Sequence, residues 1–226
     1  MVLEDIVPWG RSFTEYQAMF NLTKEDLQKN ILGCGDGPAA FNQHLSALGG
    51  RVVSIDPIYE FSTAEITARI NDVYAEVLSQ VENNKTDFVW KNIKSVDELS
   101  QVRMQAMNHF LADYDDGKQQ GRYLSGSLPN LVFTDQQFDL ALCSHFLFLY
   151  SEHFSLEQHI KSVLELCRVA KEVRIYPLVS LAGEISPHLD SLINRLKEHN
   201  IKTQVQTVDY EFQQGATKML VASNNY

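Results

Sequence analysis

Three closely spaced glycines constrain the fold of this chain more than any other stretch. Residues 30–41 read Asn-Ile-Leu-Gly-Cys-Gly-Asp-Gly-Pro-Ala-Ala-Phe, with glycine at positions 33, 35 and 37. The apolar pair before the first glycine predicts the end of a buried strand, and Pro38 suits the first position of a following helix. Glycine permits the tight turn and lets a ligand approach the backbone, because it has no Cβ. Such a strand–turn–helix unit is typical of nucleotide-binding sites.

Asp56 supports this interpretation. Residues 38–48 predict a helix, and residues 51–55 predict a second strand that ends at this acid. Because Asp56 follows the glycines by about 20 residues, its carboxylate is placed to accept hydrogen bonds from both ribose hydroxyls of a nucleotide. The alternative is an ordinary turn residue before Pro57.

Residues 57–122 interrupt the alternation of strands and helices. Ser62 with Glu65, and Ser95 with Glu98, predict the starts of two long helices. Since this segment lies between the second and third strands, we expect a helical insertion over the carboxyl edge of the sheet, acting as a lid. Four of its side chains could form an apolar substrate wall, although packing of the insertion onto the body is the favoured alternative: Trp90, Met104, Met107 and Phe110.

The α/β pattern resumes after the insertion. Residues 122–125, 138–144 and 171–177 predict three further strands, and the second of these is almost continuously apolar, as expected of a strand covered on both faces. Ser186 and Pro187 predict the start of a helix that runs to about residue 199. Residues 204–212 and 218–223 then predict a closing β-hairpin.

This order of motifs resembles the class I S-adenosylmethionine-dependent methyltransferases. The resemblance covers residues 29–223 apart from the insertion, and it depends on the Gly-Cys-Gly-Asp-Gly turn, Asp56, the Gly-Ser-Leu-Pro loop at 126–129, the apolar strand at 138–144 and the hairpin. It implies an α/β fold: a Rossmann-like three-layer sandwich with a mostly parallel seven-stranded sheet whose last strand is antiparallel. We therefore predict a single domain over residues 1–226, with the insertion at about 57–122.

The resemblance also implies a site for S-adenosylmethionine, with S-adenosylhomocysteine as product. Ser127 and Leu128 would hold the adenine, and Ser144 and His145 would lie under the methionine and sulfonium. Arg11 would bind the methionine carboxylate, since guanidinium pairs well with carboxylate; the alternative is a purely packed N-terminal arm. The full predicted set is Arg11, Gly33, Cys34, Gly35, Asp56, Pro57, Ser127, Leu128, Ser144 and His145.

Two positions depart from the family pattern. Ile31 and Ser127 stand where the family usually carries acids. These departures motivate one alternative, a non-catalytic module that binds a nucleotide or a partner. A nicotinamide-dependent oxidoreductase is the other alternative, favoured by Ala40 and Asp56 but disfavoured by the G-x-G-x-G spacing and the hairpin.

Methyl transfer from a sulfonium requires alignment of the acceptor and exclusion of water more than a dedicated nucleophile. The catalytic residues are therefore left unassigned. His145 and Tyr150 are weak candidates for a general base, which is needed only if the acceptor must lose a proton. For His145, a packing or hydrogen-bonding role is the favoured alternative.

Composition narrows the partners. The net charge of −10 argues against a nucleic-acid substrate and against an anionic membrane surface, so we expect a small-molecule acceptor, with a protein acceptor left open. The three cysteines, at 34, 143 and 167, lack metal-ligand spacing and indicate reduced thiols, and we predict no metal. The chain has no apolar run of about 20 residues and no signal-peptide pattern, so we expect a cytoplasmic protein.

Overall fold

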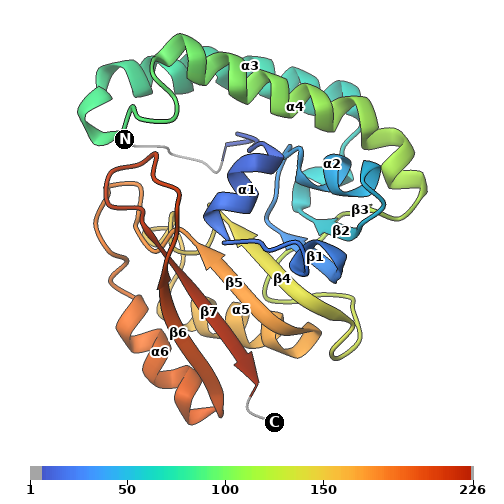
Figure 1. The fold of residues 1–226 in the computed structure, drawn as a ribbon, viewed down its shortest axis with the longest axis vertical. Helices are drawn as coiled ribbons and strands as arrows, with labels where there is room; N and C mark the ends of the chain where they lie inside the picture. Colours follow the sequence, from blue (N-terminus) through green and yellow to red (C-terminus); the bar gives the residue numbers. More distant parts are fainter. Residues whose placement is uncertain (1–6, 225–226) are drawn as a thin grey trace.

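The computed structural model of the chain describes residues 7–224, and its strands form one seven-stranded sheet in the order β3-β2-β1-β4-β5-β7-β6 (Figure 1). The strands are β1 (Asn30–Cys34), β2 (Arg51–Ile55), β3 (Tyr123–Leu124), β4 (Phe138–Ser144), β5 (Ala170–Tyr176), β6 (Ile201–Thr207) and β7 (Lys218–Asn224). Strand β7 pairs antiparallel with both of its neighbours, and all other pairs are parallel. The predicted Rossmann-like sheet with an antiparallel last strand is therefore confirmed. Residues 1–6, on which the prediction of no signal peptide depends, lie outside the described residues.

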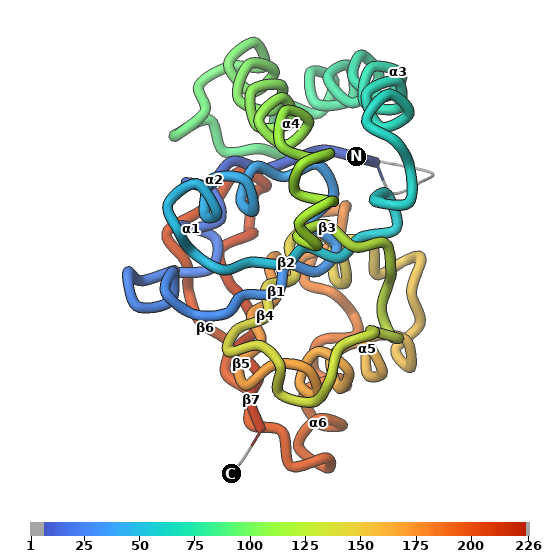
Figure 2. The backbone as a smooth tube through the Cα atoms, turned by 90° about the vertical axis from the view of Figure 1, so that its right-hand side faces the viewer, coloured from blue at the N-terminus to red at the C-terminus, as the bar shows by residue number. Residues whose placement is uncertain are grey.

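Helices cover both faces of the sheet, as Figure 2 shows. Helices α1 (Phe13–Met19) and α2 (Phe41–Ala47) pack on one face, and α5 (Leu156–Val169) and α6 (Leu189–Glu198) pack on the other. Alternate strand residues supply the two cores: Ile31 faces α1 and α2, whereas Leu32 faces α5 and α6. This alternation follows from the period of two in a strand.

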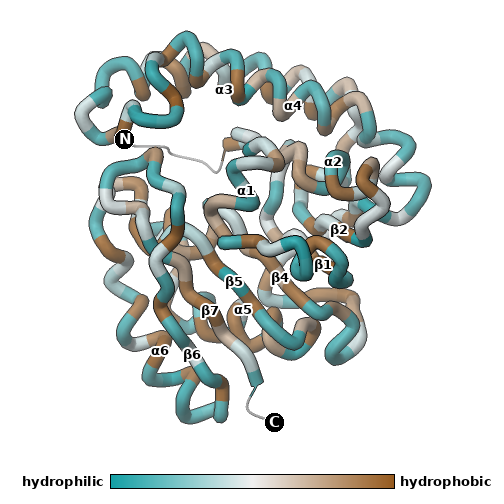
Figure 3. The backbone as a smooth tube through the Cα atoms, viewed as in Figure 1, coloured by the Kyte–Doolittle hydropathy of each residue, from teal (hydrophilic) through white to brown (hydrophobic). Residues whose placement is uncertain are grey.

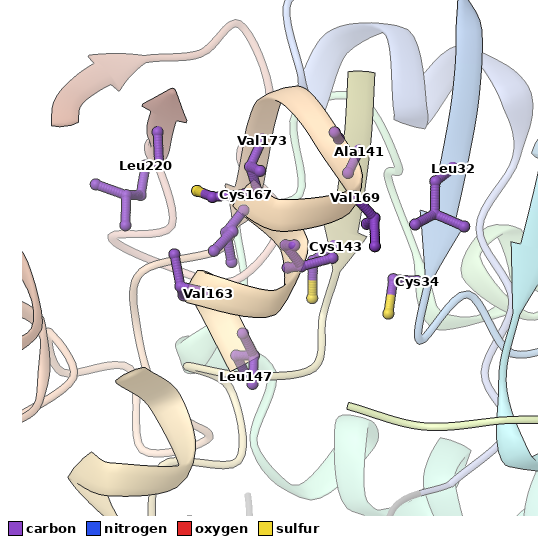
Figure 4. Close-up of a cluster of buried hydrophobic side chains, with 14 of the residues drawn as sticks. Leu32, Cys34, Ala141, Cys143, Leu147, Val163, Cys167, Val169, Val173 and Leu220 are labelled. Atoms are coloured by element: carbon purple, nitrogen blue, oxygen red, sulfur yellow. The ribbon is translucent and has the colours of Figure 1, made fainter. Parts of the chain in front are cut away.

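The three cysteines belong to the core or its edge and are free and buried (Figure 4). Cys34 and Cys143 are paired across the β1–β4 register, and Cys167 extends from α5 toward β5 and β7. Burial raises the pKa of Cys143 and Cys167 to about 12, so both remain thiols near neutral pH. They pack as small apolar side chains.

Two long helices, α3 (Thr63–Asn83) and α4 (Val96–Gln119), occupy the insertion and lie above the carboxyl ends of the strands (Figure 1). In Figure 3, apolar and polar residues alternate along both helices, as expected of helices with one buried face. Met107 and Phe110 are fully buried against Tyr59 and Tyr123, which fixes the C-terminal half of α4 to the body. Within residues 7–224, no helix combines the length and the apolar character that a membrane crossing requires.

Several element boundaries differ from the sequence predictions. Helix α2 begins at Phe41 instead of Pro38, because the turn at 38–40 is held by the N-terminal arm: the Ala40 N–H donates to the Arg11 carbonyl. Helix α6 begins at Leu189, because the Ser186 N–H donates to the Leu178 carbonyl and delays the helix. The hairpin strand predicted at 204–212 is β6, at 201–207, and residues 208–217 form a long connection to β7.

Candidate functional site

A cavity of about 440 Å³ lies beneath α3 and α4 at the carboxyl ends of the strands. Its lining includes the glycine turn, the loops after β2 to β5, and the N-terminal arm, defined here as residues 7–11. All predicted cofactor-binding residues line this cavity except Gly33, and Tyr150 lines it too. None of the four wall candidates from the insertion does: Trp90, Met104, Met107 and Phe110 pack the insertion onto the body instead.

Position 33 needs glycine because a neighbouring protein side chain lies against it, and not because a ligand approaches the backbone there. A Cβ at this position would lie 1.8 Å from Oδ2 of Asp36, so any larger residue would displace that carboxylate. Asp36 accepts hydrogen bonds from the Tyr16 hydroxyl at 2.9 Å and from Ser54 Oγ at 2.7 Å. Burial raises the pKa of Asp36 to about 7 although both hydroxyls lower it. Asp36 thus fixes the glycine turn to α1 and β2.

Ile31, where the resemblance would have placed an acid, packs in the apolar core. Asp36 supplies a carboxylate under the same turn from within the Gly-Cys-Gly-Asp-Gly string. Sequence reasoning missed this role. The available signal was an acid enclosed by glycines, with a serine inside the otherwise apolar second strand.

Asp56 lies at the end of β2 and caps a short 3₁₀ helix, η2 (Pro57–Glu60). Its Oδ1 accepts from the Ile58 N–H and its Oδ2 accepts from the Gly37 N–H, both at 2.9 Å. Each oxygen retains a further lone pair. Burial raises the pKa of Asp56, and the two N–H groups oppose that rise. The turn role and the ribose-binding role proposed from the sequence are therefore compatible.

Arg11 places a guanidinium in the cavity wall. The N-terminal arm crosses the glycine turn below α3 and α4 (Figure 2), and Gly10 lies so close to the Pro38 carbonyl that a Cβ there would lie 2.1 Å from its oxygen. Arg11 Nη1 donates to the Trp9 carbonyl, while its buried Nε has no hydrogen-bond partner among residues 7–224. Burial and the neighbouring Arg103 lower the pKa of Arg11.

Arg103 on α4 adds a second buried cation nearby. Its Nη1 donates to Glu15 Oε2 at 2.7 Å, and the Tyr210 hydroxyl donates to Glu15 Oε1 at 2.7 Å. Despite the burial of Glu15, the two arginines and these hydrogen bonds lower its pKa to about 2. One carboxylate thus lies beside two guanidiniums. Of these two cations, only Arg11 lines the cavity, and its guanidinium can pair with an anionic group there.

His145 follows β4 in a left-handed backbone conformation with φ of 50°. Its N–H donates to the Tyr176 carbonyl at 2.7 Å, and its Nδ1 lies 2.9 Å from Ser144 Oγ. Burial lowers the pKa of His145 well below its usual value, and Arg11 and Arg103 lower it further, so the imidazole is neutral. Its Nε2 has no partner among the described residues and remains available to a ligand.

Tyr150 and the loop after β3 complete the predicted site. Burial raises the pKa of Tyr150, so its hydroxyl stays protonated near neutral pH and does not act as a general base. Ser127 and Leu128 follow β3, where the Ser127 carbonyl accepts from the Asn130 N–H at 3.2 Å. A Cβ at Gly126 would lie 2.7 Å from Cδ1 of Ile55, so this loop lies directly against β2.

Comparison with known proteins places the chain in a family. No family model matches it. The uncharacterized protein MJ0045 of Methanocaldococcus jannaschii is 33% identical over 223 residues, which covers 97% of this chain and 96% of that protein. The chain belongs to the family of MJ0045. Nothing in that relationship assigns an activity.

Solved structures share the fold of this MJ0045-family chain. WbdD matches with a TM-score of 0.50 and 11% identity, over 94% of this chain and 39% of WbdD. Magnesium protoporphyrin IX methyltransferase of Synechocystis PCC 6803, with bound S-adenosylmethionine, matches with a TM-score of 0.47 and 10% identity, over 89% of this chain and 73% of that one. The methyltransferase TM1293 of Thermotoga maritima matches with a TM-score of 0.46 and 14% identity, over 93% and 87%. At these identities the likeness concerns the fold alone.

The described part of this MJ0045-family chain contains no group of three His, Cys, Asp or Glu side chains suited to hold a metal ion. The polar groups that line the cavity around the glycine turn include two carboxylates, a guanidinium and a neutral imidazole. Such a set can hold hydroxyls, an anionic group and a polar hydrogen side by side.

Proposed function

We propose that this protein transfers a methyl group from S-adenosylmethionine to a small-molecule acceptor beneath α3 and α4. The observation that carries the proposal is the order of polar groups around the glycine turn. Asp56 follows β2 on one side of β1. Arg11 lies on the other side, close enough to His145 after β4 to lower its pKa.

S-adenosylmethionine is a nucleoside joined through a sulfonium to an amino acid, and this order suits its parts. Asp56 would accept hydrogen bonds from the ribose hydroxyls, and Arg11 would bind the methionine carboxylate through charge-assisted hydrogen bonds. The neutral imidazole of His145, after β4, would avoid charge repulsion with the sulfonium. Ser127 and Leu128, after β3, would lie beside the adenine.

A nicotinamide dinucleotide suits the turn less well. Dinucleotide sites bind pyrophosphate with free N–H groups at the glycine turn and helix start. Here the Gly35 N–H donates to the Ile55 carbonyl, the Gly37 N–H to Asp56, and the Ala40 N–H to the Arg11 carbonyl. Because these donors are already occupied, the turn offers few groups to a pyrophosphate.

The residues of this chain would bind the cofactor, orient the acceptor and shield both from water. The cofactor supplies an already activated methyl group, so the protein must align the acceptor and exclude water. Helices α3 and α4 cover the cavity, and the N-terminal arm closes the space between them and the glycine turn. Nε2 of His145 would accept a hydrogen bond from the acceptor.

Calorimetry and thermal unfolding with S-adenosylhomocysteine, S-adenosylmethionine and NADH test this function. We expect saturable binding of both sulfur compounds and none of NADH. At a ligand concentration about 100 times Kd, the stabilisation is about 2.7 kcal/mol, which raises the Tm by roughly 5–10 °C for a chain of this size. Binding of NADH without S-adenosylhomocysteine would establish the oxidoreductase alternative instead.

A further inference from the structure

Helix α3 crosses the cavity from one side of the sheet to the other. It begins at Thr63, shortly after η2 and β2, and its 21 residues span about 30 Å. Just beyond its end, the Val89 N–H donates to the Phe212 carbonyl at 2.7 Å, and Phe88 forms an isolated β-bridge with Gln213. These contacts place the end of α3 over the β6–β7 connection, as Figure 1 shows. Successive turns of α3 therefore lie over successive strand ends.

The two ends of the cavity, taken along the direction of α3, differ in the polarity of their lining. Near Asp56, the lining includes Phe61 and the exposed cation Arg69. The C-terminal half of α3 instead contributes Val77 and Val81, which are buried and apolar. We call the part of the cavity below them the distal half, lined by Val77, Val81, Phe88, Leu99, Leu181, Phe212 and Ala216.

Two polar side chains at the distal half, Tyr176 and Gln213, are already bonded within the protein. The Tyr176 hydroxyl donates to the Ala216 carbonyl at 2.6 Å, and Gln213 Nε2 donates to the Ser180 carbonyl at 2.8 Å. Asp87 also lines the cavity here, but it is exposed to solvent at the end of α3. Arg103 lies over the Phe212 ring at 5.9 Å but does not line the cavity, so no cation of the described residues lines the distal half. An anionic ligand group against this wall would lose its hydration without gaining an ion pair from a lining residue, which is costly.

Aromatic rings give the wall a definite shape. Phe88 and Phe212 are stacked with ring centroids 5.0 Å apart and an interplanar angle of 26°. Trp90 meets the edge of Phe212 at 5.5 Å and supports it from outside the cavity. Such a wall favours a flat, apolar ligand.

His145 is the polar group between the cofactor part and the distal half. Its ring packs edge-on against Tyr176 at 5.4 Å, at the end of β5, and its Nδ1 lies 2.9 Å from Ser144 Oγ. In the tautomer whose Nδ1–H donates to Ser144, Nε2 is a hydrogen-bond acceptor. We propose that the methyl acceptor is a neutral, largely apolar or aromatic small molecule that occupies the distal half and presents one O–H or N–H group to Nε2 of His145. This inference rests on the proposed methyl transfer.

The methyl transfer needs no further reactant, because the cofactor, the acceptor and His145 account for every bond, electron pair and proton. The lone pair of the acceptor oxygen or nitrogen forms a bond to the methyl carbon. The carbon–sulfur bond breaks, and its electron pair stays on sulfur as S-adenosylhomocysteine. For a hydroxyl acceptor, the proton becomes strongly acidic as the bond forms, passes to Nε2 of His145 and leaves to solvent. A weak base suffices there because the methylated oxygen is positively charged before it loses this proton. A methylated amine keeps its proton through the transfer and releases it to solvent afterwards.

Binding of 2-naphthol and 2-naphthoate to the protein saturated with S-adenosylhomocysteine tests the acceptor class. We expect saturable binding of 2-naphthol and at least tenfold weaker binding of 2-naphthoate, which carries the same rings with a charge. Equal or tighter binding of 2-naphthoate would overturn the proposal, and so would failure of both probes to bind. Failure of S-adenosylhomocysteine itself to bind would instead overturn the proposed function.

Two single-residue variants test whether 2-naphthol binds in the distal half. Leu181→Asp should weaken 2-naphthol at least tenfold, with S-adenosylhomocysteine affinity within twofold of wild type. Leu181 is partly exposed, so the aspartate should be tolerated. Ile185→Asp is the matched control, since Ile185 lies in the same loop, is 55% exposed and does not line the cavity. Equal loss in both variants, or in neither, would contradict the assignment of the distal half.

The proposed hydrogen bond from the acceptor to Nε2 of His145 is tested by comparing the affinities of 2-naphthol and naphthalene. Wild-type protein should bind 2-naphthol about threefold to tenfold more tightly than naphthalene, as one neutral hydrogen bond provides. In His145→Ala this preference should disappear, whereas the control His199→Ala, at an exposed position, should retain it. A preference that survives in His145→Ala would place the polar hydrogen elsewhere.

Discussion

Asp36 is a carboxylate that the protein holds between two hydroxyl donors beneath its glycine turn. Its pKa of about 7 lies above the ordinary value of 3.8, so the folded state binds this proton more tightly than the unfolded state. The free energy of unfolding therefore falls as pH rises from about 4 to about 7, and the effect is complete above that range. The glycine turn thus carries a stability cost at neutral pH.

Replacing this carboxylate should remove that cost. We predict that the free energy of unfolding of Asp36→Asn, taken relative to that of wild type, is higher at pH 8 than at pH 5 by about 2–4 kcal/mol. Asparagine can still accept from Tyr16, and its amide can donate to Ser54 Oγ. Urea unfolding at both pH values measures the difference, with Asp190→Asn, at an exposed position on α6, as control. A difference that does not change with pH would show that Asp36 is ionised throughout.

Asp56 acts at the same scale on ligand binding. Asp56→Ala should remove two charge-assisted hydrogen bonds to the ribose, each worth roughly 1.5–3 kcal/mol. Affinity for S-adenosylhomocysteine, measured by calorimetry, should fall at least about tenfold. Because Asp56 also holds Gly37 and Ile58, circular dichroism should establish that the variant is folded. Asp209→Ala, at an exposed position, should leave the affinity unchanged. Unchanged affinity in a folded Asp56→Ala would move the ribose site elsewhere.

The sequence predicted Asp56 but not Asp36, for a physical reason. The place of Asp56 follows from the strand–helix–strand spacing, which is a local property of the chain. The role of Asp36 depends on how closely its side chain folds back over Gly33 and on what Tyr16 and Ser54 donate, and these contacts arise only from tertiary packing. The same holds for Arg103, whose partner Glu15 lies 88 residues away.

At the scale of elements, local chemistry predicted some helix starts and tertiary contacts overrode others. Ser62 caps α3 with a reciprocal capping box, as its spacing to Glu65 predicts. Ser95 also caps α4, but the Glu98 carboxylate accepts from the Lys94 N–H instead of completing the box. The helices begin three residues after Pro38 and two residues after Pro187, because the Ala40 N–H bonds to the N-terminal arm and the Ser186 N–H bonds to Leu178 in its own loop.

At the scale of the whole molecule, the alternation of strands and helices was sufficient to predict the sheet and its antiparallel last strand. It did not predict which face of the insertion lines the cavity. Val77 and Val81 line it, whereas the aromatic and methionine candidates of the insertion pack elsewhere. Both sets occupy apolar helix positions, so only the placement of α3 and α4 over the sheet distinguishes them.

The same placement bears on whether the insertion opens. The insertion is attached to the body at both ends: Phe110 and Tyr114 pack against Tyr123 of β3 at one end, and Val89 bonds to the β6–β7 connection at the other. The span of α3 between these attachments covers the cavity and has fewer buried partners than the central strands. Local opening is easiest in such segments, so we expect it in the middle of α3 and the start of α4.

Hydrogen exchange followed by mass spectrometry tests this expectation. In the free protein, residues 63–103 should exchange faster than β1, β4 and β5, and S-adenosylhomocysteine should slow them. Peptides from α6, on the opposite face of the sheet from α1 and α2, serve as control and should exchange at the same rate in both states. If residues 63–103 exchange as slowly as the central strands with and without ligand, the insertion is a fixed part of the core. The acceptor must then enter the distal half through an opening beside α3, because α3 itself does not move aside.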